Sequence, residues 1–276
     1  MSEDVEAAVE RRRRNFERRE KFSVVFYPLF AMFVLLVIWE VCTLVFSIPE
    51  FLLPKPTVVF QSIQQNASLI LRESWVTAAE IALGYLLSIA IGVPLALAIF
   101  LWPFFSRSIY PILIASQAMP KVAVAPLLIV WFGFGMLPKV LIAFLIAFFP
   151  IVINTVMGLT SIEKEKIYLA RAMGLGTIDT FFKIRLPNAM PSIFGGLKIS
   201  ITLAVVGAVV GEFVGGNAGL GYQLIVANGA MDTPMLFALL FGLTLLGIGM
   251  FLLVELAERL IVPRHMIGAG GGREMI

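Results

Sequence analysis

The chain has 276 residues, of which 59% are hydrophobic and only 14% are charged, with a formal net charge of +3. Soluble domains carry about a quarter charged residues, so this composition excludes an ordinary soluble globular protein and indicates a membrane protein with several spans. The chain has one cysteine, Cys42, and one histidine, His265, which excludes a disulfide framework and argues against a Cys/His metal site.

The chain begins with a polar, arginine-rich segment over residues 1–23, which predicts a cytoplasmic N-terminal segment without a cleavable signal peptide. Six apolar stretches follow, each near the roughly 20 residues that cross a bilayer core. They cover 24–46, 77–101, 109–131, 139–158, 192–214 and 235–257. The sequence therefore predicts an all-α membrane domain over 24–260 with six transmembrane helices, followed by a flexible cytoplasmic tail over 261–276.

The distribution of basic residues predicts the orientation in the membrane. Six spans leave both termini on one side, and most Lys and Arg residues outside the spans lie on that side. Examples are Arg11–Arg14, Arg107 and Arg259, whereas the opposite side has only Lys55 and Arg72. The positive-inside rule therefore predicts that both termini are cytoplasmic.

Ionisable groups within the predicted spans are costly and usually face the bundle interior or a wet path. The candidates are Glu40, Glu80, Lys121 and Glu212. Lys121 lies in a predicted broken helix between Pro120 and Pro126, with Gln117 one turn before it. Two interpretations stay open: Gln117, Pro120, Lys121 and Glu212 line or gate a translocation path, or Lys121 and Glu212 form a structural pair or reach an interface.

Small residues on the fifth span allow another helix to approach closely. They are Gly195, Gly196, Ser200, Gly207, Ala208 and Gly211. They could form the contact with a second copy of the chain, or pack within one copy.

The polar stretch 160–191 between the fourth and fifth spans is longer and more basic than a simple connection requires. The pattern predicts a helix over Lys164–Met173 that stops at Gly174 and Gly176. Thr177 is expected to cap a second helix, which Pro187 ends. This helix–glycine–helix elbow would present Ile167, Ala170 and Gly174 as a small-residue surface. It is either a docking surface for another protein or a hairpin that only joins two spans.

No pattern for nucleotide chemistry or nucleophilic catalysis is present. The glycines at 215, 216, 219 and 221 follow an apolar span rather than a strand, and no lysine follows them, so they do not predict a phosphate site. A single histidine near the C-terminus cannot build a Ser/His/Asp set. If the protein does work, a partner must supply the energy.

The polar stretch resembles the cytoplasmic loop of binding-protein-dependent ABC transporter permeases, whose pattern is Glu-Ala-Ala, three residues, Gly, nine residues and Ile-x-Leu-Pro. The residues that fit are Ala170, Gly174, Ile184, Leu186 and Pro187. The chain departs from the pattern at Tyr168 and Leu169, which stand where the family has Glu and Ala. The resemblance implies that an ATPase-coupling loop is formed by Ile167, Ala170, Arg171, Gly174, Ile184, Leu186 and Pro187.

Three further segments resemble the nitrate/sulfonate/taurine and thiamine-precursor branch of these permeases. They begin at Leu53 (Leu-Pro-Lys-Pro-Thr), at Pro120 (Pro-Lys-Val-Ala-Val-Ala-Pro) and at Gly211 (Gly-Glu-Phe-Val-Gly-Gly-Asn-Ala-Gly-Leu-Gly-Tyr). The resemblance implies a substrate that is a small sulfonate-like or nitrate-like anion, or a thiamine-precursor or pyrimidine-like heterocycle.

The resemblance also implies an assembly in a bacterial-type inner membrane. It would contain two copies of this permease, two cytoplasmic ATPase subunits and an extracytoplasmic solute-binding protein, with no nucleic acid. The permease would be non-catalytic and bind no cofactor, since ATP and Mg²⁺ bind the ATPase. The alternatives are a stand-alone secondary carrier, for which no inverted repeat is visible, and a membrane scaffold.

Overall fold

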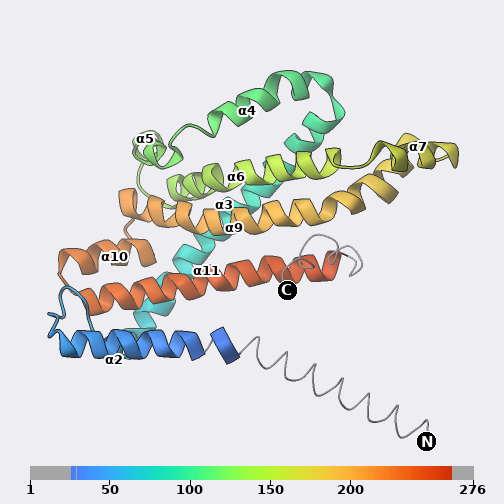
Figure 1. Cartoon of the computed structure of the whole chain (residues 1–276). Coiled ribbons are helices and arrows are strands. Elements are labelled where there is room, and N and C mark those ends of the chain that lie inside the picture. The colour runs from blue at the N-terminus through green and yellow to red at the C-terminus, as the bar shows by residue number, and fades with distance from the viewer. Residues whose placement is uncertain (1–25, 29, 263–276) are drawn as a thin grey trace, which may run out of the picture. The chain divides into compact units, whose positions relative to one another are not determined.

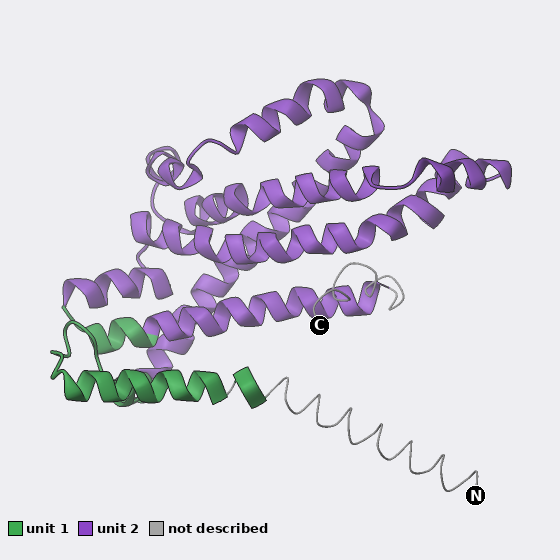
Figure 2. Ribbon diagram, viewed as in Figure 1, with its two compact units in different colours: residues 1–65, 231–238 green, residues 66–230, 239–276 purple. Residues whose placement is uncertain are grey.

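The computed structural model describes residues 26–28 and 30–262, and every regular element within them is a helix. The predictions for the segment 1–23 and for the tail beyond Val262 concern residues outside this part of the chain. Two compact units are formed, one by residues up to 65 with 231–238, and one by residues 66–230 with those from 239 onward (Figure 2).

The first unit contains a helix over Phe26–Val45, helix α2 (Pro56–Gln65) and the start of helix α11 (Thr233–Ile261). Glu40 on the first helix accepts hydrogen bonds from the backbone N–H of Thr57 at 3.2 Å and from its hydroxyl at 3.0 Å. Glu40 thereby satisfies a donor that the first turn of α2 leaves open.

The second unit is built on α3 (Ala67–Leu101), α6 (Met136–Thr160) and α9 (Leu186–Gly215). Helices α6 and α9 run side by side and α3 crosses them (Figure 1). A Cβ added to Gly84 of α3 would lie 2.6 Å from the Cβ of Ala143 on α6, and one added to Gly207 of α9 would lie 2.6 Å from its Cα. Glycine at these positions lets three backbones approach around one alanine.

The small residues of α9 therefore pack largely within one copy. Added Cβ atoms at Gly196 and Gly211 would meet Asn154 at 2.6 Å and Lys139 at 2.9 Å, both on α6. Gly195 has open space around it, with no heavy atom within 4 Å of its added Cβ among the described residues.

The six predicted spans correspond to five long helices and one bent pair. The bent pair consists of Phe105–Ser116 and Lys121–Phe132, which meet at 88°. Its parts are η1 (Phe105–Ile109), α4 (Tyr110–Ser116), η2 (Lys121–Val124) and α5 (Ala125–Phe132). The predicted break in the third span is thus confirmed.

The polar stretch contains α7 (Lys164–Ala172), α8 (Thr177–Thr180) and the π-helical turn η3 (Phe181–Arg185). The prediction that Pro187 ends the second helix was wrong, because helix continues from Thr177 to Gly215. The Leu186 N–H bonds to the Phe181 carbonyl, one residue further back than in an α-helix. Pro187 therefore falls in the first turn of α9, where its missing N–H costs little.

Candidate functional site

The elbow at 160–191 is closed by Gly174. This residue has φ +82, which favours glycine, and its N–H bonds to the Arg171 carbonyl at 2.9 Å, while the Leu175 N–H bonds to the Ala170 carbonyl at 3.0 Å. This pair of bonds satisfies carbonyls at the end of α7 and reverses the chain. The predicted stop at Gly174 is confirmed. Gly176 instead precedes α8 as its N-cap residue, and Thr177 lies inside that helix, so both of those predictions were wrong.

The exposed surface of the elbow differs from the predicted one. Ala170 is only 2% exposed, because its side chain faces the interior of the elbow, so it cannot contribute to an outer small-residue surface. Ile167 is half-buried, and Gly174 is exposed. The outer surface is instead formed by large apolar side chains that are between 61% and 75% exposed, namely Tyr168, Leu169, Met173, Ile178 and Phe182.

The remaining residues of the family pattern anchor the elbow to the membrane helices. Ile184, Leu186 and Pro187 are half-buried. Leu186 packs against a buried cluster that includes Leu159 of α6 and Ala189 of α9. Helix α7 lies beyond the ends of α6 and α9 (Figure 1). The elbow is thus held at the ends of two long helices, and its large apolar side chains are exposed.

The bend in the third span exposes polar groups of a single copy. Gln117 and Pro120 are exposed, and Lys121 is half-buried. The Lys121 Nζ lies 4.6 Å from the centroid of the Phe149 ring, a cation–π contact. Among residues 26–28 and 30–262, Lys121 makes no ion pair with Glu212, so the interpretation in which these two residues form a structural pair is not supported.

The structure places Glu212 in a different polar cluster, which joins α3, α6 and α9. We call it the clasp, and its members are Glu73, Thr77, Glu80, Lys139 and Glu212. All five are buried, and Glu212 has no exposed surface. Lys139 on α6 forms an ion pair of 2.7 Å with Glu80 on α3, and its ammonium also donates to the Ala218 carbonyl at 3.1 Å.

Side chains of the clasp accept hydrogen bonds from three consecutive backbone N–H groups at the start of α10 (Leu220–Gly229). Gly219 donates to Glu73 at 2.7 Å, Leu220 to the Thr77 hydroxyl oxygen at 2.9 Å, and Gly221 to Glu212 at 2.5 Å. The Thr77 hydroxyl in turn donates to Glu212 at 2.6 Å. Side chains from α3 and α9 thus satisfy the donors that the first turn of α10 leaves open.

Glycine is required at positions 219 and 221 because the backbone there lies very close to the Glu212 carboxylate. A Cβ added to Gly219, which has φ +106, would lie 1.9 Å from Glu212 Oε1. One added to Gly221 would lie 2.6 Å from Glu212 Oε2. The N–H groups of Gly219 and Gly221 in this glycine-rich loop thus bond to carboxylates of the same chain.

Three clasp residues, Glu73, Thr77 and Lys139, were not predicted from the sequence. A signal for two of them was present: Glu73, Thr77 and Glu80 are spaced by four and three residues, which places them on one face of a helix. The predicted second span began only at 77, so Glu73 was not placed on the same helix as Thr77 and Glu80. Lys139 stood at the edge of a predicted span and gave no comparable signal.

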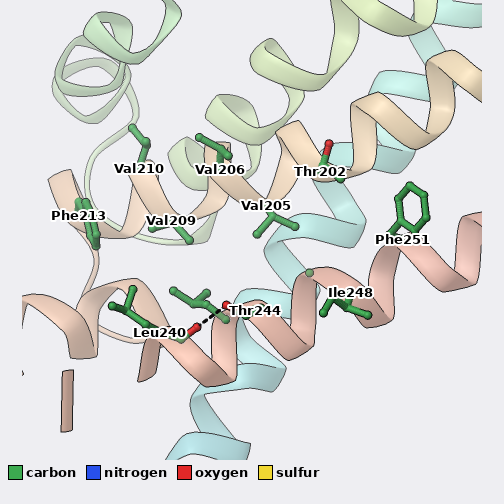
Figure 3. A pocket seen from close by; sticks show the side chains of 12 residues that line it. Thr202, Val205, Val206, Val209, Val210, Phe213, Leu240, Thr244, Ile248 and Phe251 are labelled. Atoms are coloured by element: carbon green, nitrogen blue, oxygen red, sulfur yellow. Dashed lines mark hydrogen bonds between the residues drawn. The ribbon is translucent and has the colours of Figure 1, made fainter. Parts of the chain in front are cut away.

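An apolar groove of about 630 Å³ lies between α9 and the second-unit part of α11 (Figure 3). Nearly all of the side chains that line it are aliphatic or aromatic, among them Val205, Phe213 and Leu240. The hydroxyl of Thr244 donates to the backbone carbonyl of Leu240. The groove therefore offers almost no polar group for recognising a polar solute.

A family model described as the inner membrane component of binding-protein-dependent transport systems matches residues 84–266. The match includes the bent third span, the elbow and, of the clasp, Lys139 and Glu212. It leaves out Glu73, Thr77 and Glu80, which lie before residue 84.

Known proteins are similar over most of the chain. The formylaminopyrimidine transport permease protein ThiX of Halalkalibacterium halodurans is 38% identical over 86% of this chain and 94% of its own length. The riboflavin transport system permease protein RibX of Chloroflexus aurantiacus is 38% identical over 84% of this chain and 87% of its own length. An inward-facing structure of the MetNI methionine ABC transporter matches 72% of this chain and 99% of the solved chain, with a TM-score of 0.60 and 21% identity. The chain therefore belongs to the inner membrane components of binding-protein-dependent transport systems, the permease subunits of ABC importers, as the sequence predicted.

Proposed function

We propose that two copies of this chain form the membrane channel of an importer driven by two cytoplasmic ATPase subunits and fed by an extracytoplasmic solute-binding protein. The observation that carries the coupling role is the elbow. It projects Tyr168, Leu169 and Met173 into the surroundings from a segment otherwise rich in charge. Exposed apolar side chains grouped in this way mark a protein-binding surface.

A continuous helix connects the elbow to the clasp. Residues Thr177–Gly215 form one helix of 39 residues, about 58 Å long at the usual rise per residue. Its N-terminal part, up to residue 191, belongs to the elbow, and its last turn carries Glu212. In the orientation predicted by the positive-inside rule, the elbow is cytoplasmic and the clasp lies near the outer surface. Movement of the elbow by an ATPase would therefore reach the outer ends of α3 and α6 through Glu212.

We propose that Gln117, Pro120 and Lys121 line the translocation path, and that Glu212 acts at its outer end by holding the loop before α10. Backbone that leaves the helix at membrane depth is tolerated only against protein or water. Within the described residues of one copy the bend at 117–120 is exposed, so these residues alone do not enclose it. A second copy of the chain, facing this bend across a wet path, would provide both.

For the substrate we propose a flat nitrogen heterocycle of the aminopyrimidine type rather than a sulfonate. The support is that two relatives, each 38% identical, carry names that refer to formylaminopyrimidine and riboflavin transport. Stimulation of the reconstituted ATPase by binding protein loaded with formylaminopyrimidine, and not with taurine, is the expected result. The reverse preference would contradict the assignment.

The coupling role is tested by copurification of an ATPase with the detergent-solubilised chain and with Gly174→Asp. A Cβ at Gly174 meets no heavy atom within 4 Å among the described residues, and aspartate tolerates positive φ better than most side chains. The variant should fold and lose the ATPase. Gly229→Asp, at another open glycine far from the elbow in the sequence, should retain it.

Failure of the wild-type chain to retain any ATPase would favour the stand-alone carrier. The path is tested separately by Lys121→Met, which should reduce uptake while leaving ATPase retention unchanged. Full uptake at normal expression would contradict the role of Lys121.

A further inference from the structure

The inner side of the elbow contains a small basic pocket of about 200 Å³. We call it the elbow pocket. Its polar lining comes from Arg171 on α7, Arg185 on η3 and the two threonines Thr177 and Thr180, and Ile167 contributes an apolar wall. Its volume admits a single side chain.

The charges around the elbow leave this pocket positive. Lys166 pairs with Glu163 at 3.3 Å, and Lys183 pairs with Asp179 at 2.7 Å. Among the described residues no ion pair includes Arg171 or Arg185. Two guanidinium groups therefore line one cavity to which no described residue contributes a carboxylate.

One of these arginines is already held in place. The Arg185 guanidinium lies 5.0 Å from the centroid of the Phe100 ring, and Nη1 donates to the Leu159 carbonyl at 3.5 Å. A guanidinium that is fixed by stacking loses little further freedom when it binds an anion. Arg171 is exposed and can close on the same anion from the other wall.

We infer that the elbow pocket binds an aspartate or glutamate side chain of the ATPase subunit, gripped between Arg171 and Arg185. The inference rests on the proposed docking role of the elbow. It is supported by the chain's own departure from the family pattern, since Tyr168 stands where the family has a glutamate. The elbow thus lacks that acid and presents two arginines that form no ion pair within the described part of the chain, so the complementary partner group is an acid.

A carboxylate fits the surroundings better than a lipid headgroup. Membrane-binding basic patches are clusters of several Lys and Arg residues of one sign. The elbow instead alternates both signs, with Glu163, Glu165 and Asp179 close in sequence to its cations. Arginine binds carboxylates through two parallel hydrogen bonds, which suits a pocket that holds one side chain.

The test coexpresses the full chain with its ATPase and measures how much ATPase is retained on the immobilised permease. The variants are Arg171→Gln and Arg185→Gln, and the matched control is Lys164→Gln, which removes one exposed positive charge from the same helix outside the pocket. Loss of a buried charge pair should lower the affinity about tenfold or more in each arginine variant. Lys164→Gln should bind as the wild type does. Arg171→Lys should lie between, because lysine keeps the charge without the bidentate geometry.

The pattern of ATPase retention among the variants decides between the outcomes. Loss confined to the arginine variants, with unchanged thermal stability of the isolated permease, supports the inference. Equal retention by all variants overturns the inference and leaves the proposed docking role standing, whereas no retention even by the wild type overturns both. A defect that appears in nanodiscs with anionic lipid and disappears in phosphatidylcholine alone would assign the pocket to a headgroup and overturn the inference as well.

Discussion

The clasp and the elbow lie at opposite ends of the helix Thr177–Gly215 and differ in which side chains they bury and which they expose. In the clasp, the polar side chains are buried and most of their polar atoms bond to one another or to backbone groups of the same chain, with Glu80 Oε2 left without a partner among the described residues. In the elbow, apolar side chains are exposed, and Arg171 and Arg185 form no ion pair with any described residue. A region that satisfies its own groups stabilises the fold, whereas a region that leaves them unsatisfied is available to a partner.

The largest loss of stability is expected from Lys139→Met. Removal of Lys139 leaves Glu80 buried without its cation, which typically costs about 3–5 kcal/mol. The free energy of unfolding in detergent or lipid measures the effect. Lys183→Met, which breaks an exposed pair with Asp179, is the matched control and should cost less than about 1 kcal/mol.

A second variant separates the buried charge from the lost packing. The double variant Lys139→Met, Glu80→Met should be more stable than Lys139→Met alone, because apolar replacements of both partners leave no buried charge. Equal stability of the single and double variants would show that the ion pair is not what Lys139 contributes.

The next largest effect is expected from Gly219→Ala. Alanine at φ +106 is strained, and its Cβ would lie 1.9 Å from Glu212 Oε1, so we expect a cost of about 3 kcal/mol. Gly229→Ala has open space within the described structure and should be neutral or slightly stabilising. Thermal unfolding of both variants checks the comparison, and similar midpoints would contradict the close approach at Gly219.

A smaller effect is expected from Thr77→Val, which removes a hydroxyl that donates to Glu212 and accepts from Leu220. Leaving these buried groups without a partner should cost about 2 kcal/mol. Thr155→Val is a matched control, because the Thr155 hydroxyl is buried without a hydrogen-bond partner among the described residues. That substitution should be neutral or stabilising. If both variants lose stability equally, the Thr77 hydrogen bonds contribute little.

The smallest effect on stability is expected at the elbow. The double variant Met173→Ser, Ile178→Ser changes two exposed side chains, so the free energy of unfolding should change by less than about 0.5 kcal/mol per site. Retention of the ATPase should nevertheless fall, since these side chains form the proposed docking surface. A variant that keeps both stability and ATPase would remove the functional contrast between elbow and clasp.

The sequence alone determined the membrane class, the six apolar segments, the break in the third span and the stop at Gly174. These features depend on local composition, on proline, and on a glycine that can adopt positive φ. The sequence pattern also led to the permease family. Local signals were sufficient because each of these features is decided within one segment of the chain.

Only the tertiary structure decided which polar groups meet. Glu212 bonds to Thr77, which is 135 positions away in the chain, and the ion pair of Lys139 joins α6 to α3. Likewise, Ala170 is buried because the chain folds back at Gly174, and Pro187 does not end its helix because a π-helical turn precedes it. Such outcomes depend on how helices pack against one another, and helical periodicity in one segment carries no information about the partner helix.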